Sequence, residues 1–582
     1  MLAAVITLQE LNALTPREFV AALASVFEHS PWVPERVAGS RPYPSGIALH
    51  EAMCGALLQA GESQQLALIR AHPELAGRAA IRGDLTPAST SEQRGAGLAA
   101  CTPLEYERLQ ALNAAYRARF DFPFVLAVKG HTPQSVIAAL ERRTTQGRDA
   151  ERSTALQEIC RIARFRLADL VDEPIGGAII AMAEDLARFS ETPDGLTCSY
   201  LTPAHIATAA RIRDYMLAAG LIVYGDAVGN VVGVLPGDGR TRRHLLTGSH
   251  YDTVINAGKY DGRLGILLPI AVAGAMRRAG SHLPYSLEII AFAEEEGVRF
   301  KSTFLGSRAV AGRFEPEVLR SLDAQGISLR EAMAAAGHDA ASIGAIARDP
   351  AQLSGFVEVH IEQGPVLLDA GIPVGVVTGI AGSIRRMLTV QGLSGHAGTV
   401  PMALRHDAAT AAAEIVLAVE RRCGGEAGLV GTVGKLEVPG GAVNVIPGRC
   451  ELSLDIRSGS DAVRDAAVAD IDAEIERIAG RRGVAVERRT VLEAAGVQCA
   501  AVFQDAWSAS IERVTGKPAM RLPSGAGHDA MMMASITDIG MLFVRCGNGG
   551  ISHHPAETLS ADDAAVAARV FQDFLQHFKV SA

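Results

Sequence analysis

The pattern of apolar and polar positions divides the chain into two stretches of different character. From residue 1 to about residue 170, apolar residues recur every three to four positions, as on one face of a helix, in segments such as FVAALASVFEHS and PLEYERLQALNAAYRARF. Polar and proline-containing clusters separate these segments, and Thr102-Pro103 and Thr132-Pro133 are typical of helix N-termini. Strand-like runs are nearly absent. The pattern predicts an all-α domain that ends at Asp172-Glu173-Pro174.

Beyond this boundary, short β-rich runs alternate with helical ones. The clearest β-rich runs are NVVGVL, HLLTGSH, SLEIIAFAEE, GFVEVHIEQG and IGMLFVRCG, and their alternation with helices predicts an α/β sheet domain. From about residue 384 to residue 498, three other β-rich runs surround two helical ones, which predicts an α+β insert within the sheet domain. We therefore expect a multidomain protein: an all-α domain (1–173), an α/β domain (174–383 and 499–582) and an inserted α+β domain (384–498).

Composition narrows the class of protein. The chain has 582 residues, of which 48% are hydrophobic and 20% charged, so it can bury several cores. Its net charge of -9 gives no basic footprint for nucleic acid, and the longest apolar run, Leu264 to Met276, is too short to span a bilayer. The scattered cysteines form no C-x-x-C pair, and the N-terminal stretch lacks the features of a secretory signal. We expect a soluble, cytoplasmic protein that binds neither nucleic acid nor membranes.

Ionisable residues gather where the predicted apolar strands of the second half end, which is where α/β proteins build their sites. They are His250 and Asp252 after HLLTGS, Asp261 before the next helix, Glu294–Glu296 after LEIIAFA, His360 after a third strand, and His553 near the C-terminus. Three adjacent carboxylates repel one another and are costly to bury without a cation. Any one of these groups taken alone is better explained as a solvated cap on a core strand. Together they favour a site for divalent ions such as zinc, manganese or nickel.

The same residues lie in motifs that resemble a known family. TGSHYDTV, GKYDGRLG, AEEEGVRF, HIEQGPVL, SGHAGTVPM, NVIPG, DIRS, SGAGHDA and ISHHPAE follow one another as in the dinuclear metal amidohydrolases of the carboxypeptidase/aminoacylase superfamily. The closest resemblance is to its allantoate amidohydrolases, N-carbamoyl-L-amino-acid hydrolases and ureidoglycolate amidohydrolases, over about residues 175–582. It implies two divalent ions (Zn, Mn or Ni) with the ligands Asp261 as a bridge, His250 and His360 on one ion, and Glu296 and His553 on the other.

The resemblance also implies roles for residues around the metals. Asp252 would orient His250, and Glu295 would be the general base for the attacking water. The substrate would be bound by Gln363 and His528 at its ureido end, by Asn444 and Arg457 at its carboxylate, and by His396 from a partner subunit, which implies a homodimer through residues 384–498. From the residues alone, Asn444 could equally be a turn residue and Arg457 a surface cation. Glu294 is either supporting or merely solvated.

The helical half contains a second constellation. His72 stands before a proline at a predicted helix end, Ser89 to Gln93 have the composition of a helix N-terminus, and Arg166 lies in the final amphipathic helix. Without further information each of these is explained by ordinary helix chemistry or a surface position. The residues alone indicate only a helical domain.

A resemblance gives this half a function. AHPELAG, STSEQ, FDFPFVLAVKG and EICRIARFRL are similar to segments of 2-oxo-4-hydroxy-4-carboxy-5-ureidoimidazoline (OHCU) decarboxylase, over about residues 10–170. This implies that His72 is the acid–base group at the departing carboxylate, that Glu92 is its partner, and that Ser89, Gln93 and Arg166 bind the substrate. A protonated His72 could then reprotonate one face of the substrate. No cofactor is expected, because the electrons left by the departing carbon dioxide can delocalise into the substrate ring.

The two resemblances together predict a bifunctional enzyme of ureide (urate) degradation that acts on small anionic ureides. Its reactions would be OHCU decarboxylation to (S)-allantoin and hydrolysis of allantoate to ureidoglycine, ammonia and carbon dioxide. Two alternatives stay open. The C-terminal half could be an N-carbamoyl-L-amino-acid hydrolase or ureidoglycolate amidohydrolase, and the N-terminal half could be a non-catalytic docking or oligomerisation module.

Overall fold

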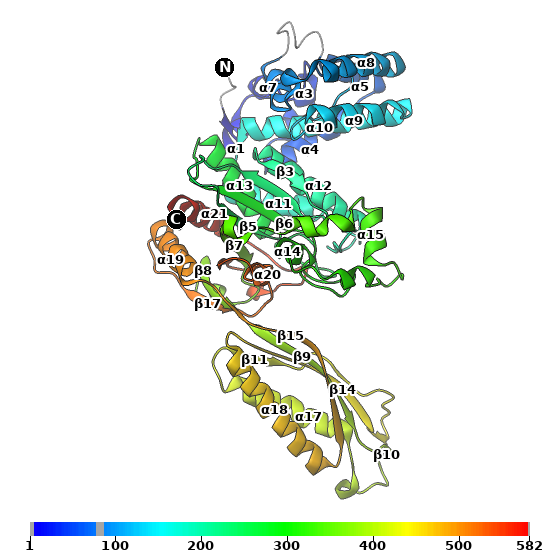
Figure 1. Cartoon of the computed structure of the whole chain (residues 1–582), viewed down its shortest axis with the longest axis vertical. Helices are drawn as coiled ribbons and strands as arrows, with labels where there is room; N and C mark the ends of the chain where they lie inside the picture. Colours follow the sequence, from blue (N-terminus) through cyan, green and yellow to red (C-terminus); the bar gives the residue numbers. More distant parts are fainter. Residues whose placement is uncertain (1–4, 77–85, 580–582) are drawn as a thin grey trace.

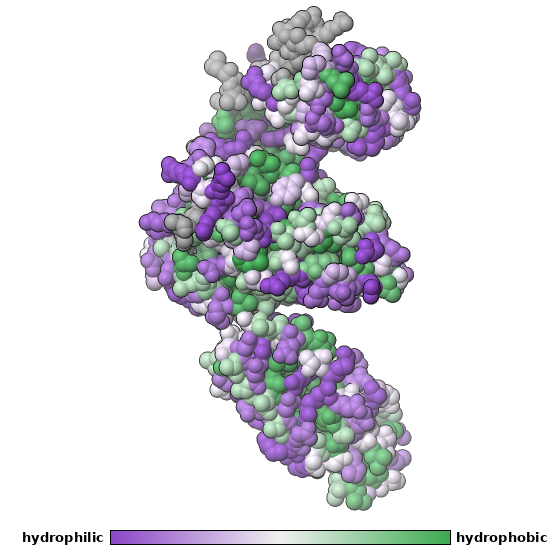
Figure 2. Space-filling view, in the orientation of Figure 1, coloured by the Kyte–Doolittle hydropathy of each residue, from purple (hydrophilic) through white to green (hydrophobic). Residues whose placement is uncertain are grey.

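The computed structural model describes residues 5–76 and 86–579. Three parts follow one another along the long axis of the molecule (Figure 1): a helical part, a central α/β part and a second sheet covered by two helices. The predicted fold class, all-α followed by α/β with an α+β insert, is confirmed. Figure 2 shows the narrowest waist between the central part and the second sheet. Within the described residues, no helix combines the length and the apolar character that a membrane crossing requires.

The helical part contains α1(Leu8–Ala13), α2(Pro16–Ala22), α3(Trp32–Val37), α4(Gly46–Leu58), α5(Glu62–Ala71), α7(Pro87–Gly95), α8(Pro103–Phe120), α9(Pro133–Thr144) and α10(Arg148–Leu170). Thr102 and Thr132 cap α8 and α9, as the sequence predicts. Helix α7 begins two residues before Ser89, because the hydroxyl of Thr86 accepts the backbone N–H of Ser89 and caps the helix. Short strands β1(Ile6–Thr7) and β2(Val171–Asp172) pair in parallel and tie the two ends of this part together.

A nine-stranded sheet forms the central part. Its order is β16(Val497–Gln498), β8(Val374–Ile380), β18(Ile539–Val544), β7(Leu353–Ile361), β5(His244–His250), β6(Ser286–Phe292), β4(Val231–Leu235) and β3(Ile222–Gly225), with β17(Arg521–Ser524) beside β8. The five β-rich runs predicted from the sequence form β4, β5, β6, β7 and β18. Strands β18, β7, β5 and β6 are parallel neighbours, so their carboxyl ends meet at one edge of the sheet.

Helices cover this sheet and connect its strands. The longer ones are α11(Ile175–Leu186), α12(Pro203–Ala218), α13(Leu264–Arg278), α19(Ala501–Thr515) and α21(Ala561–His577); the shorter ones are α14(Leu305–Val310), α15(Leu329–Ala335), α16(Val366–Asp369) and α20(Ala530–Met533). Helix α13 lies on β5 and β7, and α11 and α21 pack against it. Glycine and small residues permit this close packing: a Cβ on Gly265 of α13 would lie 2.3 Å from the carbonyl oxygen of Val359 in β7.

The second sheet is antiparallel, with the order β11(Leu429–Thr432), β14(Arg449–Ser458), β9(Gly382–Gln391) and β15(Ala485–Ala494), and β12(Leu436–Glu437) also pairs with β14. Helices α17(Ala408–Gly424) and α18(Asp461–Arg482) pack against it, and β10(Gly395–His396) pairs with β13(Val445–Ile446) at the end remote from the central part (Figure 1). We call this part, from β9 to β15, the lid.

The helical part and the α/β part share one hydrophobic core, whereas the lid has a separate one. One continuous cluster of buried side chains runs from the helical part into the α/β part, and includes Leu167 of α10, Ile212 of α12 and Ile270 of α13. The lid has a separate cluster of its own, built from residues such as Ile415 and Ile475. The helical part is therefore packed onto the α/β part through shared core, whereas the chain enters the lid at β9 and leaves it after β15.

Candidate active sites

The first candidate site lies at the carboxyl edge of the parallel strands. His250 is the last residue of β5, His360 stands next to last in β7, and Glu295 and Glu296 follow the end of β6. Strand β5 pairs with both β6 and β7, so these side chains converge from three adjacent strands. The sequence pattern of ionisable residues at strand ends therefore becomes a single cluster in space.

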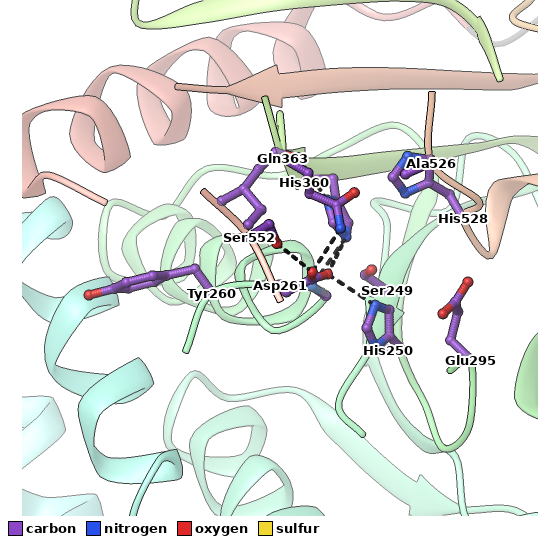
Figure 3. A network of polar contacts seen from close by, with 12 residues as sticks. Ser249, His250, Tyr260, Asp261, Glu295, His360, Gln363, Ala526, His528 and Ser552 are labelled. Carbon is purple, nitrogen blue, oxygen red and sulfur yellow. Dashed lines mark hydrogen bonds and ion pairs between the residues drawn. The ribbon is translucent and has the colours of Figure 1, made fainter. Parts of the chain in front are cut away.

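Asp261 stands at the centre of this cluster (Figure 3). Its Oδ1 lies 3.5 Å from Nε2 of His250 and 3.3 Å from Nε2 of His360, and its Oδ2 lies 3.2 Å from Nε2 of His553. His553 is also 3.6 Å from Oε1 of Glu296. The two oxygens of Asp261 thus face two different sets of ligands, which is the geometry of a carboxylate able to bridge two ions.

Hydrogen bonds to Glu557 and Ser552 fix the loop that carries Asp261. The carboxylate of Glu557 accepts the backbone N–H groups of Tyr260 and Asp261, at 2.8 and 3.2 Å, and the hydroxyl of Ser552 donates to both Asp261 and Glu557. Gly262 follows with φ 64°, where a Cβ would lie 2.5 Å from the His250 ring, so only glycine fits. Sequence reasoning gave no role to Ser552 or Glu557, although both stand in the ISHHPAE motif.

The histidine rings are oriented by their second nitrogens. Nδ1 of His360 donates to the carbonyl oxygen of Ile361 at 2.8 Å, and Nδ1 of His250 lies 3.1 Å from the carbonyl oxygen of Asp252. Both arrangements leave Nε2 directed at Asp261. The Asp252 carboxylate accepts the backbone N–H groups of Glu295 and Glu296, so it lies behind His250 and also fixes the acidic turn.

Negative charge is in excess here. Burial raises the pKa of Glu294 and of Glu295 well above the ordinary value, and it raises the pKa of Glu296 to about 7. Both oxygens of Glu294 are buried without a hydrogen-bond partner among residues 5–76 and 86–579. The alternative that Glu294 is merely solvated is therefore wrong, because the strand end on which it lies is covered. Buried carboxylates of this kind need a cation.

The donor set fits a pair of divalent ions. Among the described residues, four groups of three potential ligands lie close enough to hold an ion, and Asp261 belongs to two of them: one adds His250 and His360, the other adds Glu296 and His553. Nitrogen and carboxylate donors suit zinc and similar borderline metals. His553 is about half exposed, with a side-chain exposure of 49%, so the cluster opens to solvent on its side.

Gln363 and His528 lie beside the cluster, as Figure 3 shows. The amide nitrogen of Gln363 donates to Oδ2 of Asp261 at 2.7 Å, and its backbone has φ 56°. The His528 ring lies 4.6 Å from the His360 ring, centre to centre, and its Nε2 is 2.7 Å from the hydroxyl of Ser524. Burial lowers the pKa of His528 well below the ordinary value, so this ring is neutral.

The predicted substrate-binding residues of the lid lie at its two opposite ends. Arg457 lies where β14 meets the α/β part, and it donates to the carbonyl oxygen of Gly525 at 2.6 Å and to the carboxylate of Asp455. His396 and Asn444 lie together on the β10–β13 pair, exposed and at the far end of the lid (Figure 1). Within one chain, therefore, the structure brings Arg457 toward the His528 loop but leaves His396 and Asn444 apart from the metal ligands.

The second candidate site lies in the helical part and is organised by Arg166 of α10. The guanidinium donates to both oxygens of Glu92, at 2.8 and 3.0 Å, to Oε2 of Glu28 at 2.8 Å, and to the hydroxyl of Ser89 at 3.2 Å. Glu28 is 4% exposed and had no recognisable sequence signal, since it stands in a turn region far from the motifs AHPELAG and STSEQ. Arg166 is thus a buried, paired cation that lines the pocket rather than a surface charge.

His72 completes this site. It ends α5, is 6% exposed, and lines one small pocket with Ser89, Glu92, Gln93 and Arg166. Burial, with the nearby Arg166, lowers the pKa of His72 to about 4. In the unliganded site His72 is therefore neutral, because a second positive charge next to Arg166 in a buried pocket is unfavourable. The amide oxygen of Gln93 accepts the N–H of Ala76 at 3.0 Å, which ties α7 to the segment that follows His72.

Comparison with known proteins gives both halves a family. Residues 12–168 match OHCU decarboxylase, and residues 246–577 match peptidase family M20/M25/M40. An N-carbamoyl-L-amino acid amidohydrolase of Geobacillus stearothermophilus is 44% identical over 359 residues, which are 62% of this chain and 87% of the relative. An allantoate deiminase of Arabidopsis thaliana is 39% identical over 427 residues, which are 68% of this chain and 81% of the relative.

Solved structures agree with these relatives. The crystal structure of AtUAH in complex with glyoxylate is 34% identical, with a TM-score of 0.59, and the match covers 69% of this chain and 97% of that one. The chain therefore belongs to peptidase family M20/M25/M40, among its allantoate deiminases and N-carbamoyl-L-amino acid amidohydrolases, with an OHCU decarboxylase domain fused to its N-terminal side.

Proposed function

We propose that this chain is a bifunctional enzyme of ureide degradation, which decarboxylates OHCU to (S)-allantoin and hydrolyses allantoate to ureidoglycine, ammonia and carbon dioxide. The observation that carries the proposal is the presence of both families in one chain. The product of the first reaction is one ring-opening away from allantoate. Allantoin must be opened elsewhere before the second site can act, so no direct transfer between the two sites is proposed.

In the C-terminal site, we assign the metal ligands to His250, Asp261, Glu296, His360 and His553. Two divalent ions bound there would act as Lewis acids toward the attacking water and the amidic carbonyl. Glu295 would accept a proton from that water and deliver it to the departing nitrogen, a role for which its raised pKa is suited. Gln363 and His528 would position the ureido group, with Asp252 as the support of His250.

The substrate carboxylate would be bound by Arg457, whose forked guanidinium matches a carboxylate in shape and charge. His396 and Asn444 would complete the site from a second copy of the chain, because their own lid holds them away from the metal ligands. This is supported by the exposed position of both residues on the β10–β13 pair. The proposed assembly is therefore a homodimer through the lid.

In the N-terminal site, Arg166, Ser89 and Gln93 would bind the substrate, and His72 would act first as a base. A neutral imidazole can accept a proton from the bound substrate and return it to the ring carbon after carbon dioxide leaves, which would fix the stereochemistry. Glu92 would anchor Arg166 and partner His72 in this transfer. Proton transfer of this kind needs no cofactor.

The proposed domain boundaries can be compared with the ends of helices and strands. In the proposed division into residues 1–173, 174–383 with 499–582, and 384–498, the first boundary is supported by the end of α10 at Leu170 and the start of α11 at Ile175. The lid sheet spans Gly382 to Ala494, and β16 pairs with β8 of the central sheet, so the strands favour lid bounds of 382 and 494.

A second candidate for the C-terminal site is N-carbamoyl-L-amino-acid hydrolysis, which the 44% identity to the Geobacillus enzyme favours. The test is ammonia or amino-acid release by the full chain with manganese, measured on allantoate, ureidoglycolate and a set of N-carbamoyl-L-amino acids. We expect kcat/KM for allantoate to exceed the others by at least about tenfold, a difference of about 1.4 kcal/mol. Absence of allantoate turnover, with turnover of an N-carbamoyl amino acid, would establish the second candidate instead.

The alternative of a non-catalytic helical part is tested by His72→Ala. We expect decarboxylation by the full chain to fall by about a hundredfold or more, with hydrolase activity unchanged. Identical decarboxylation by the wild-type chain and the variant, both at the spontaneous rate, would leave the helical part as a docking or oligomerisation module.

A further inference from the structure

Two adjoining pockets at the junction of the helical and α/β parts belong to neither active site. The first is a mainly apolar cavity of about 160 Å³, with walls from α4 and α10 on one side and from α11, α12 and α13 on the other. The second is lined by charged side chains of α4, α10 and α12. His50 of α4 and Arg164 of α10 line both pockets, so these two side chains stand where the apolar and the charged pocket adjoin.

Arg164 provides a cation whose guanidinium lies over the Tyr215 ring, 5.9 Å from its centre, and has no hydrogen-bonded acid within the described residues. Its side chain is 12% exposed, and the hydrogen bonds among residues 5–76 and 86–579 include none from its guanidinium. The nearest carboxylate oxygen is Oδ2 of Asp185, 3.9 Å away, which already accepts from Arg211 and Tyr215. The other arginines of the charged pocket each have a bonded acid: Arg161 with Asp214, Arg188 with Glu51, and Arg211 with Asp185.

His50 provides an acceptor that is also without a partner. It is 5% exposed, and its Nε2 donates to the carbonyl oxygen of Cys160 at 2.7 Å, so Nδ1 carries no hydrogen. Burial lowers the pKa of His50 to about 3, so the ring stays neutral, and Nδ1 has no hydrogen-bond partner within the described part of the chain. A buried acceptor left unsatisfied costs free energy, which a donor on a ligand would recover.

We propose that this junction binds a small organic acid with a flat apolar body, one carboxylate and an N–H donor beside it. The apolar body would occupy the cavity, whose volume is close to the roughly 150 Å³ of an apolar cavity that admits a benzene ring. The carboxylate would pair with Arg164 as a two-pronged acceptor, and the N–H would donate to Nδ1 of His50. These three requirements together exclude neutral apolar compounds and simple inorganic anions.

The position of this junction site links it to both reactions. Helix α10 carries Arg164 and, two residues later, Arg166 of the decarboxylase site; helix α13 begins three residues after Asp261. A bound acid would contact both helices at once. Binding of such an acid could therefore change the activity of both catalytic parts. The binding itself does not depend on the proposed function, but the identity of the two reactions does.

The test uses indole-2-carboxylate and the full chain, with binding measured by calorimetry. We expect one molecule per chain, at least about tenfold weaker binding to Arg164→Gln, and unchanged binding to the control Arg161→Gln, which alters a paired arginine of the same pocket. Indole-2-carboxamide, which lacks the charge, and benzofuran-2-carboxylate, which lacks the N–H, should each bind at least about tenfold more weakly. The variants His72→Ala and Asp261→Asn should bind like the wild-type chain, whatever their catalytic activity.

Hydrogen exchange on the wild-type chain locates the ligand independently of any variant. Indole-2-carboxylate should slow exchange in residues 46–58 and 264–278, the helices α4 and α13. Wild-type affinity in Arg164→Gln, loss of binding in His72→Ala or Asp261→Asn, or protection confined to the active sites would each overturn the proposal. Equal binding of the benzofuran acid would remove His50 from the proposed contacts.

Discussion

Each of the two active sites buries a histidine, and the pKa of that histidine shifts in opposite directions in the two sites. Burial and Arg166 lower the pKa of His72 to about 4. For His250, burial also acts to lower the pKa, but Asp252 and Asp261 outweigh it and raise the pKa well above the ordinary value. The difference lies in the neighbours. In the helical part, one arginine pairs with both Glu28 and Glu92, whereas the strand ends of the α/β part gather carboxylates with no arginine bonded to them among the residues described.

The helical site therefore contains a bonded cation among its acids, whereas the buried carboxylates of the hydrolase site need cations. Arg166 lies between Glu28 and Glu92 and pairs with both. In the hydrolase site, the carboxylate of Asp261 lies within 3.5 Å of Nε2 of three histidines, yet Glu294 stays buried without a partner in residues 5–76 and 86–579. Substitutions and changes of pH should affect the two sites differently. We expect the largest effect on activity from a substitution at Asp261.

Replacing Asp261 by Asn should abolish the hydrolase and leave the decarboxylase intact. Loss of the bridging carboxylate removes a ligand from both proposed ions, so we expect activity on allantoate to fall on the order of a thousandfold. Elemental analysis should show fewer than two ions per chain. A variant that kept two ions and its activity would contradict the assigned ligands, and decarboxylation of OHCU serves as the internal control for folding.

Replacing Arg166 by Met should affect both stability and decarboxylation. The change leaves Glu28 buried without its cation, and breaking a buried pair costs about 3 kcal/mol or more of unfolding free energy. Adding Glu28→Gln should recover part of the stability, measured by denaturant unfolding, but none of the decarboxylation. If the double variant regained activity, the role of Arg166 would be structural and the proposed substrate contact would be wrong.

The lowered pKa of His72 makes folding stability depend on pH in a defined direction. Below about pH 6.5 the unfolded chain binds a proton at His72, whereas the folded chain does so only near pH 4. Stability is therefore complete above pH 6.5 and falls as the pH drops toward 4, by up to roughly 3 kcal/mol for this group. Comparing wild type with His72→Gln by denaturant unfolding across this range isolates the contribution, and equal slopes would refute it.

The strands and most residues of the two sites could be predicted from the sequence. The roles of Glu28, Ser552 and Glu557 could not. The apolar strands and their terminal His250, Glu295 and His360 were recognisable because period and composition are local properties. Glu28 was not, since nothing in its own segment distinguishes it from a surface acid. Its role comes from α10, which brings Arg166 to it across 138 positions of sequence. Ser552 and Glu557 lay in a recognised motif, but only the folded loop shows that they support Asp261.

Motifs in the chain suffice to identify the two families, the order of helical, α/β and lid parts, and the chemical types available at each strand end. Which of these side chains meet, and in what charge state, follows only from the folded arrangement. It places His72 beside a cation and His250 among acids, it holds His396 and Asn444 away from the metal ligands of their own chain, and it creates the junction pockets between α10 and α13. Pairing, burial and pKa depend on distances between segments far apart in sequence, and packing alone sets those distances.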